Sequence, residues 1–227
     1  MWTRTIDRVI EQEWITQAAD GLADAVKNAY ASGGEGARRL KSALNGVWLG
    51  HPLHATITDV PLGSWTLAAV LDVAALMGGN EGLENAATAA VGVGLAGAVA
   101  AAAAGATDWS DTDGRARRIG LVHGLLNLGA AGLYAISFAL RRRDAHAGGR
   151  VVGLLGFCTA LASAYLGGTL VYEEQIGVDH AAGQTGPEKF TAAMPAGDLE
   201  DGAMKKVDVD GTRVLLVREG STVRAFA

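Results

Sequence analysis

The hydrophobic pattern of the chain is dominated by four long apolar segments: residues 55–78, 86–107, 119–140 and 151–172. Each is close to the length of about 20 apolar residues that a helix needs to cross the hydrocarbon core of a bilayer. Of the 19 basic and 24 acidic residues in the chain, only Asp59 and Asp72 fall within these segments. Helices of a soluble bundle would each need a polar stripe. The pattern therefore predicts a mostly α fold built on a four-helix transmembrane bundle.

The second apolar segment, residues 86–107, consists largely of Ala and Gly, and we expect it inside the bundle, where small residues allow helices to approach closely. It contains the spacing G-x-G-x-x-G at residues 92–97. In dinucleotide-binding proteins this spacing follows a strand and opens a helix. Here it is surrounded by helical sequence, so it is predicted to be a packing motif.

The N-terminal segment, residues 1–47, has a helical period of its own. Apolar residues recur about every fourth position, at Ile6, Ile10, Trp14, Ala18, Leu22 and Val26. This spacing predicts one amphipathic helix over residues 3–30, followed by a short helix over 36–47. Because the polar face is not rich in Lys or Arg, packing on the end of the bundle is favoured over anchoring to lipid. The transmembrane domain then covers residues 48–180.

The C-terminal segment, residues 187–227, changes to β-prone sequence. Short apolar runs are separated by Asp210-Gly211 and Gly220-Ser221, which is typical of a β meander. About 40 residues cannot bury a stable core alone. We therefore expect this segment either to dock on the bundle or to form part of a larger domain.

Composition narrows the classes of function. The single cysteine, Cys158, excludes an intramolecular disulfide and a thiolate metal cluster built from this chain. The net charge of −5 gives no reason to expect a nucleic-acid partner. The N-terminus does not have the pattern of a secretory signal. Of the basic residues that flank the helices, six lie on the side that carries both termini and four lie on the other side. We expect a multi-pass protein of the cell membrane with both termini in the cytoplasm.

Polar residues in or beside the apolar segments gather at the end of the bundle that carries the termini. They include four of the five histidines: His51, His54, His123 and His180. Imidazoles on facing helices commonly bind haem iron, zinc or copper. We expect a haem b to use His54 and His123, and a metal ion to use His51 and His180.

Four further residues could support these histidines: Asp59, Asp108, Asn127 and Tyr172. Asn127 lies four residues after His123 on the same helical face, and the two aspartates could accept hydrogen bonds from ring N–H groups. Two other interpretations remain open: a structural polar network that closes the end of the bundle, and a proton path. Asp72, at the other end, is interpreted as an interfacial or helix-pairing carboxylate.

Short motifs in the membrane region carry a family resemblance. They are HPLH followed by Pro61, the pair Asp108-Trp109, H-x-x-x-N at 123–127, and GGTLVYEEQIGV at 167–178. In this order and spacing, roughly residues 45–180 resemble a bacterial four-helix membrane domain of unknown function, the family numbered 2231. The resemblance implies the fold and supplies no mechanism.

Residues 187–227 are similar to the opening strands of a Rieske 2Fe–2S domain, with an acidic Leu199-Glu-Asp-Gly turn, a hairpin and a Val-Arg-Ala-Phe run. A Rieske centre needs two Cys and two His, and residues 187–227 contain neither. A 2Fe–2S cluster is therefore expected only if the chain continues beyond residue 227. The resemblance implies electron transfer.

Together these features predict a membrane-anchored redox component, an electron-transfer protein more than a stand-alone enzyme. Its expected partners are the lipid bilayer, a redox partner protein and a second copy of the chain. The alternative is a small transporter or structural membrane subunit with a polar network and no cofactor.

Overall fold

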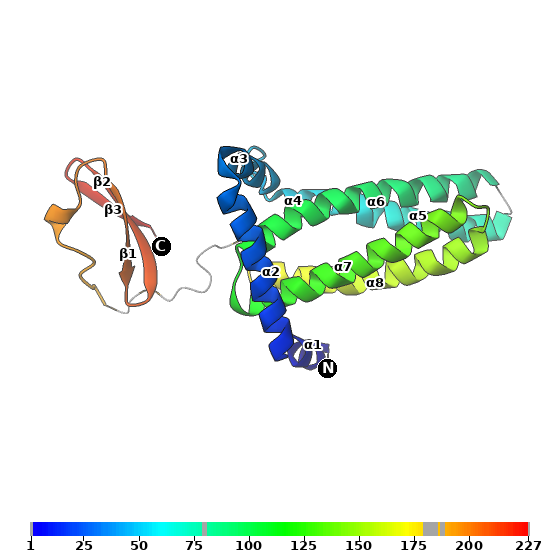
Figure 1. Ribbon diagram of the computed structural model, residues 1–227, viewed down its shortest axis with the longest axis horizontal. Coiled ribbons are helices and arrows are strands. Elements are labelled where there is room, and N and C mark those ends of the chain that lie inside the picture. Colours follow the sequence, from blue (N-terminus) through cyan, green and yellow to red (C-terminus); the bar gives the residue numbers. More distant parts are fainter. Residues whose placement is uncertain (1, 79–80, 179–185, 187–188, 227) are drawn as a thin grey trace. The chain divides into compact units, whose positions relative to one another are not determined.

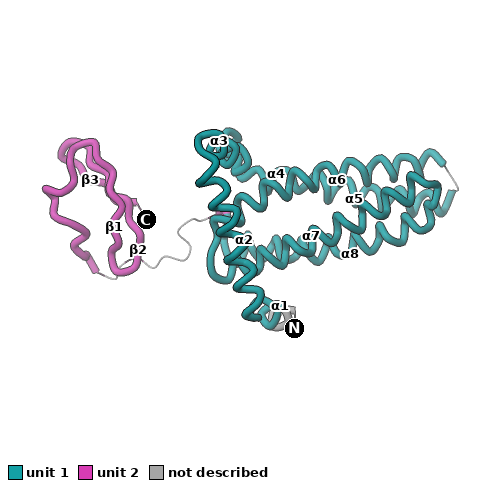
Figure 2. The backbone as a smooth tube through the Cα atoms, in the orientation of Figure 1, with its two compact units in different colours: residues 1–176 teal, residues 177–227 magenta. Residues whose placement is uncertain are grey.

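The computed structural model describes residues 2–78, 81–178, 186 and 189–226. These residues form two compact units, residues 1–176 and 177–227 (Figure 2). The first unit is helical and the second contains a small β-sheet, which confirms the predicted fold class.

The first unit has eight described helices, three that precede the membrane region and five that form it: α1 (Trp2–Ile10), α2 (Glu13–Ser32), α3 (Gly34–Leu44), α4 (Leu53–Ile57), α5 (Asp59–Gly78), α6 (Glu81–Ser110), α7 (Gly114–Arg141) and α8 (His146–Tyr172). Within the described residues, four spans are long and apolar enough to cross a membrane, because α4 and α5 together form one span, Leu53–Gly78. Figure 1 shows α5, α6, α7 and α8 running alongside one another as a bundle.

The break between α4 and α5 has a local cause. Pro61 lies in the first turn of α5, where its missing N–H costs nothing. Its ring would clash with the carbonyl of Ile57 in a continuous helix, so α4 ends at Ile57 and α5 begins at Asp59.

Glycines of α6 allow the first span to pack closely against it. A Cβ atom at Gly94 would overlap the indole ring of Trp65, and one at Gly97 would lie 2.7 Å from Val60. The Trp65 ring in turn stacks on Tyr134 of α7, with 4.1 Å between ring centroids. The G-x-G-x-x-G sequence is thus a packing motif within a continuous helix, as predicted.

A buried ion pair joins the first and third spans at the end of the bundle away from the termini. Arg141 of α7 donates two hydrogen bonds to Asp72 of α5, at 2.7 and 2.5 Å. The Arg141 side chain is 1% exposed, and its Nε donates to Ser137. Asp72 is therefore a helix-pairing carboxylate. Its partner Arg141 is one of the four basic residues that were counted as flanking the helices on the side away from the termini.

The N-terminal segment differs from the prediction of a single helix over residues 3–30. Two helices, α1 and α2, are separated by Glu11 and Gln12, and Gln12 has an extended backbone (ψ 132°). The predicted apolar face is also only partly right, because α2 buries Ile15 and Ala19 instead of Trp14. The break lets α1 and α2 pack separately on the bundle, and Figure 1 shows α2 crossing its end.

The second unit contains a 3₁₀ turn, η1 (Ala196–Asp198), and three strands: β1 (Met204–Val209), β2 (Thr212–Glu219) and β3 (Thr222–Phe226). The strands form an antiparallel sheet in the order β1-β2-β3. Asp210 and Gly211 both have positive φ at the first turn, and Gly211 donates its N–H to Asp208 at 2.9 Å. The predicted β meander is confirmed.

Candidate functional site

The structure brings His54 and His123 together, although they are far apart in the sequence. His54 lies on α4 and His123 on α7, and their ring centroids are 6.3 Å apart with perpendicular planes. We refer to these two residues as the histidine pair. At about 1.5 Å per residue, His123 lies roughly 13 Å into α7 from its first residue, Gly114. The pair is therefore inside the bundle and not at its rim.

Contacts with α6 fix the ring of His54. Its Nδ1 N–H donates to the carbonyl of Ala101 at 2.8 Å. A Cβ atom at Gly105 would come within 2.6 Å of the same nitrogen. Gly105 thus makes room for the ring, and the Ala101 carbonyl determines which nitrogen carries the proton.

The ring of His123 is held more completely. Its Nδ1 N–H donates to the carbonyl of Ser163 at 2.8 Å, and the Ser163 hydroxyl donates to the carbonyl of His123 at 3.0 Å. The side-chain amide of Asn127 donates to Nε2 at 3.0 Å. Ser163 is fully buried, and Gly167 leaves space beside the ring. Both α7 and α8 therefore orient this imidazole.

Both histidines have the tautomer that metal-binding histidines use. A neutral imidazole whose Nδ1 donates to a carbonyl presents its Nε2 lone pair, and this second bond orients the ring and raises its basicity. Within the described residues, Nε2 of His54 has no hydrogen-bond partner, whereas Nε2 of His123 accepts from Asn127.

Of the supporting residues predicted from the sequence, Asn127 and Asp108 lie with the histidine pair. Asp108 is half-buried on α6, one turn after Gly105, which lies against the His54 ring. However, the ring N–H groups of both histidines donate to backbone carbonyls and not to carboxylates. Asp59 is exposed on α5 and is not among the contacts of the pair.

The two predicted metal ligands, His51 and His180, and the supporting residue Tyr172 are not shown to contact the pair. His51 is exposed in the turn before α4, and Tyr172 is 85% exposed at the end of α8. His180 lies outside the described residues. Within the described part of the chain, no group of three or more His, Cys, Asp and Glu side chains is placed to hold a metal ion.

The sequence reasoning missed a set of ion pairs that ties the N-terminal helices to this end of the bundle. Arg115 bonds to Asp7 of α1 and Glu174, Arg117 bonds to Asp20 of α2 at 2.7 Å, and Lys41 of α3 bonds to Asp111. In the sequence analysis, these three basic residues contributed only to the six-to-four count of charges that flank the helices. The acidic residues on the polar faces of the N-terminal helices could have indicated that they form ion pairs.

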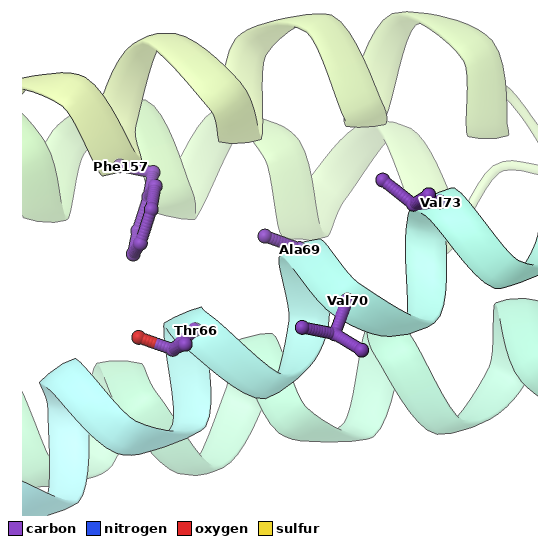
Figure 3. A pocket seen from close by; sticks show the side chains of 5 residues that line it. All are labelled: Thr66, Ala69, Val70, Val73 and Phe157. Carbon is purple, nitrogen blue, oxygen red and sulfur yellow. The ribbon is translucent and has the colours of Figure 1, made fainter.

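A shallow groove on the outer face of the bundle offers no comparable site. It lies between α5 and α8 and is lined by Thr66, Ala69, Val70, Val73 and Phe157 (Figure 3). Its one hydroxyl, on Thr66, donates to the carbonyl of Leu62 at 2.7 Å. We interpret this groove as part of the surface that faces lipid.

These features define a polytopic four-helix membrane protein with a polar cluster inside one end of its bundle. Residues 50–180, more than half of the chain, match the family described as "Predicted membrane protein (DUF2231)". The chain belongs to this family, as its motifs indicated. Comparison with curated proteins and with solved structures finds no match.

Proposed function

We propose that the protein is a membrane-anchored electron-transfer component whose histidine pair, His54 and His123, binds a haem b or a single metal ion. The observation that carries the proposal is the juxtaposition of two imidazoles, each held by a backbone carbonyl at Nδ1. Imidazole nitrogens bind metals at about 2.0–2.1 Å, so two rings must lie close together to share one ion. The ring centroids of His54 and His123 are 6.3 Å apart, which supports the proposal.

The donor set suits a particular group of metals. Two neutral imidazoles suit haem iron, copper or zinc better than magnesium or calcium, which prefer oxygen ligands. A haem iron or a copper ion bound here would supply one-electron chemistry. The protein would orient both rings through Ala101 and Ser163, and the amide of Asn127 would have to leave Nε2 of His123.

The second part of the proposal concerns the C-terminal unit. Its antiparallel meander, β1 to β3, is the arrangement that the resemblance to a Rieske domain leads one to expect. Residues 187–227 contain no Cys or His, so this part of the chain holds no cluster ligand. We propose that the unit takes part in contacts with a redox partner on the cytoplasmic side.

The proposal is tested by absorption spectroscopy and metal analysis of the purified full-length protein, with His54→Ala and His123→Ala as variants. We expect a Soret band or a stoichiometric metal in the wild type and its loss in both variants. His51→Ala is the matched control and should retain the bound group, because His51 is exposed and outside the pair. Absence of both haem and metal in protein purified from haem- and metal-replete cells would refute the proposal.

One observation favours a second candidate, a small transporter or structural subunit with a polar network and no cofactor. Both ring nitrogens of His123 already have hydrogen-bond partners, Ser163 and Asn127. Asn127→Leu separates the two candidates. A binding site should keep its metal or haem when the competing amide is removed, whereas a purely structural network should lose stability by about 1–3 kcal/mol with no ligand to be found.

A further inference from the structure

Helix α2 has two adjacent apolar stripes, and the bundle covers only one of them. Ile15 and Ala19 are buried against Leu121 of α7. Trp14 and Leu22 lie roughly 100° further around the helix and are 59% and 52% exposed. The contacts of α2 indicate what covers this exposed apolar stripe.

An ion pair fixes how α2 is rotated about its own axis. Helix α7 runs inward from the end of the bundle, so Arg117 lies one turn nearer that end than Leu121. Asp20 of α2 bonds to Arg117 at 2.7 Å. The side of α2 that carries Asp20 therefore faces the end of the bundle, and the opposite side, with Trp14 and Leu22, faces the membrane.

Further into the bundle from α2, the face of α7 that carries Leu121 is exposed and apolar. Leu125 and Leu128 follow Leu121 at helical spacings of four and seven, and they are 48% and 70% exposed. Since α7 is one of the membrane spans, this face contacts lipid. The exposed stripe of α2 is thus continuous with the lipid-facing surface of the bundle.

We propose that α2 lies in the interfacial region of the bilayer, with Trp14 and Leu22 inserted at the boundary between headgroups and acyl chains. Trp is suited to this boundary because it combines a large apolar ring with one N–H donor. The opposite, polar face carries Glu13, Gln17 and Asp24, so attraction to anionic lipid does not contribute. The insertion therefore depends on apolar area and is equally strong in neutral bilayers.

Spin labels on the full-length protein in nanodiscs test this placement. Leu22→Cys and, as a matched control on the polar face, Asp24→Cys are made in a Cys158→Ser background. Collision with oxygen, which concentrates in lipid, is compared with collision with a water-soluble nickel chelate. We expect the label at position 22 to have a several-fold higher ratio of oxygen to nickel accessibility than the label at position 24, in phosphatidylcholine alone and with phosphatidylglycerol added.

Three results would overturn the proposal. Equal nickel accessibility at positions 22 and 24 would place the stripe in water, and exclusion of both reagents from position 22 would indicate a second protein surface. Protection only when phosphatidylglycerol is present would show electrostatic binding instead. Trp14→Cys and Glu13→Cys, whose side chains lie about 100° apart around the helix, give a second comparison two turns or more away, so a variant that fails to fold does not leave the question open.

Discussion

Each ring of the histidine pair packs against a glycine, Gly105 for His54 and Gly167 for His123. Gly105 is the clearest case, since a Cβ atom there would approach Nδ1 of His54 to 2.6 Å. The hydrogen bond from His54 to Ala101 requires this close approach of α4 to α6. Gly105 is thus part of the site, because it leaves the space that the His54 ring fills.

We expect Gly105→Ala to destabilise the protein by about 1–3 kcal/mol through overpacking, and to displace the His54 ring. Thermal unfolding in detergent micelles measures the change. Gly129→Ala on α7 is the control, because a Cβ atom there meets nothing within 4 Å. If the two variants unfold at the same temperature, His54 does not pack on α6 as described.

At the scale of helices, the Asp72–Arg141 pair holds the bundle together at the end opposite the histidine pair. Breaking a buried ion pair by removing one partner costs about 3–5 kcal/mol, because the remaining charge is left in an apolar environment. Asp72→Asn should therefore lower the stability by about this amount. The double variant Asp72→Leu, Arg141→Leu should lose less than either single variant.

The same unfolding experiment on Glu35→Gln provides the comparison. Glu35 pairs with Arg39 on α3, where both side chains are largely exposed, so the loss should stay below about 0.5 kcal/mol. Equal effects of Asp72→Asn and Glu35→Gln would show that the buried pair does not contribute to stability.

The helices themselves were predictable because each span repeats a local property, apolar composition over the thickness of a bilayer. The proximity of His54 and His123 was also anticipated, since both histidines lie toward the same end of the bundle. The partner of Asp72 was not, because Arg141 is the last residue of its helix and its charge was assigned to the region outside the membrane. The break at Gln12 was missed because it allows Ile10 and Ile15 to contact α7, which is far away in the sequence.

At the scale of the whole molecule, the two units should be separable in stability. The helical unit, residues 1–176, has its own buried core around Trp65 and Tyr134. A chain ending at Val178 should therefore unfold at the same temperature as the full-length protein, measured by circular dichroism at helical wavelengths. A marked drop would mean that the β unit contributes to the fold of the bundle.

The orientation in the membrane is the second prediction at this scale. The basic residues that flank the helices predict both termini in the cytoplasm, and this orientation would place the turn before α7 in the cytoplasm and the turn before α8 outside. In a Cys158→Ser background, a membrane-impermeant maleimide should label Asp144→Cys in intact cells and Asp113→Cys only after permeabilisation. Both positions are exposed, so the reverse pattern would establish the opposite orientation.

We propose above that the histidine pair binds a redox-active group. The most direct measurement is a spectroelectrochemical titration of the purified protein in nanodiscs, with the His54→Ala and His123→Ala variants beside it. We expect a reversible one-electron change in absorbance in the wild type that both substitutions abolish. A wild-type protein that shows no reversible absorbance change, or one that keeps the change in both variants, would contradict the account.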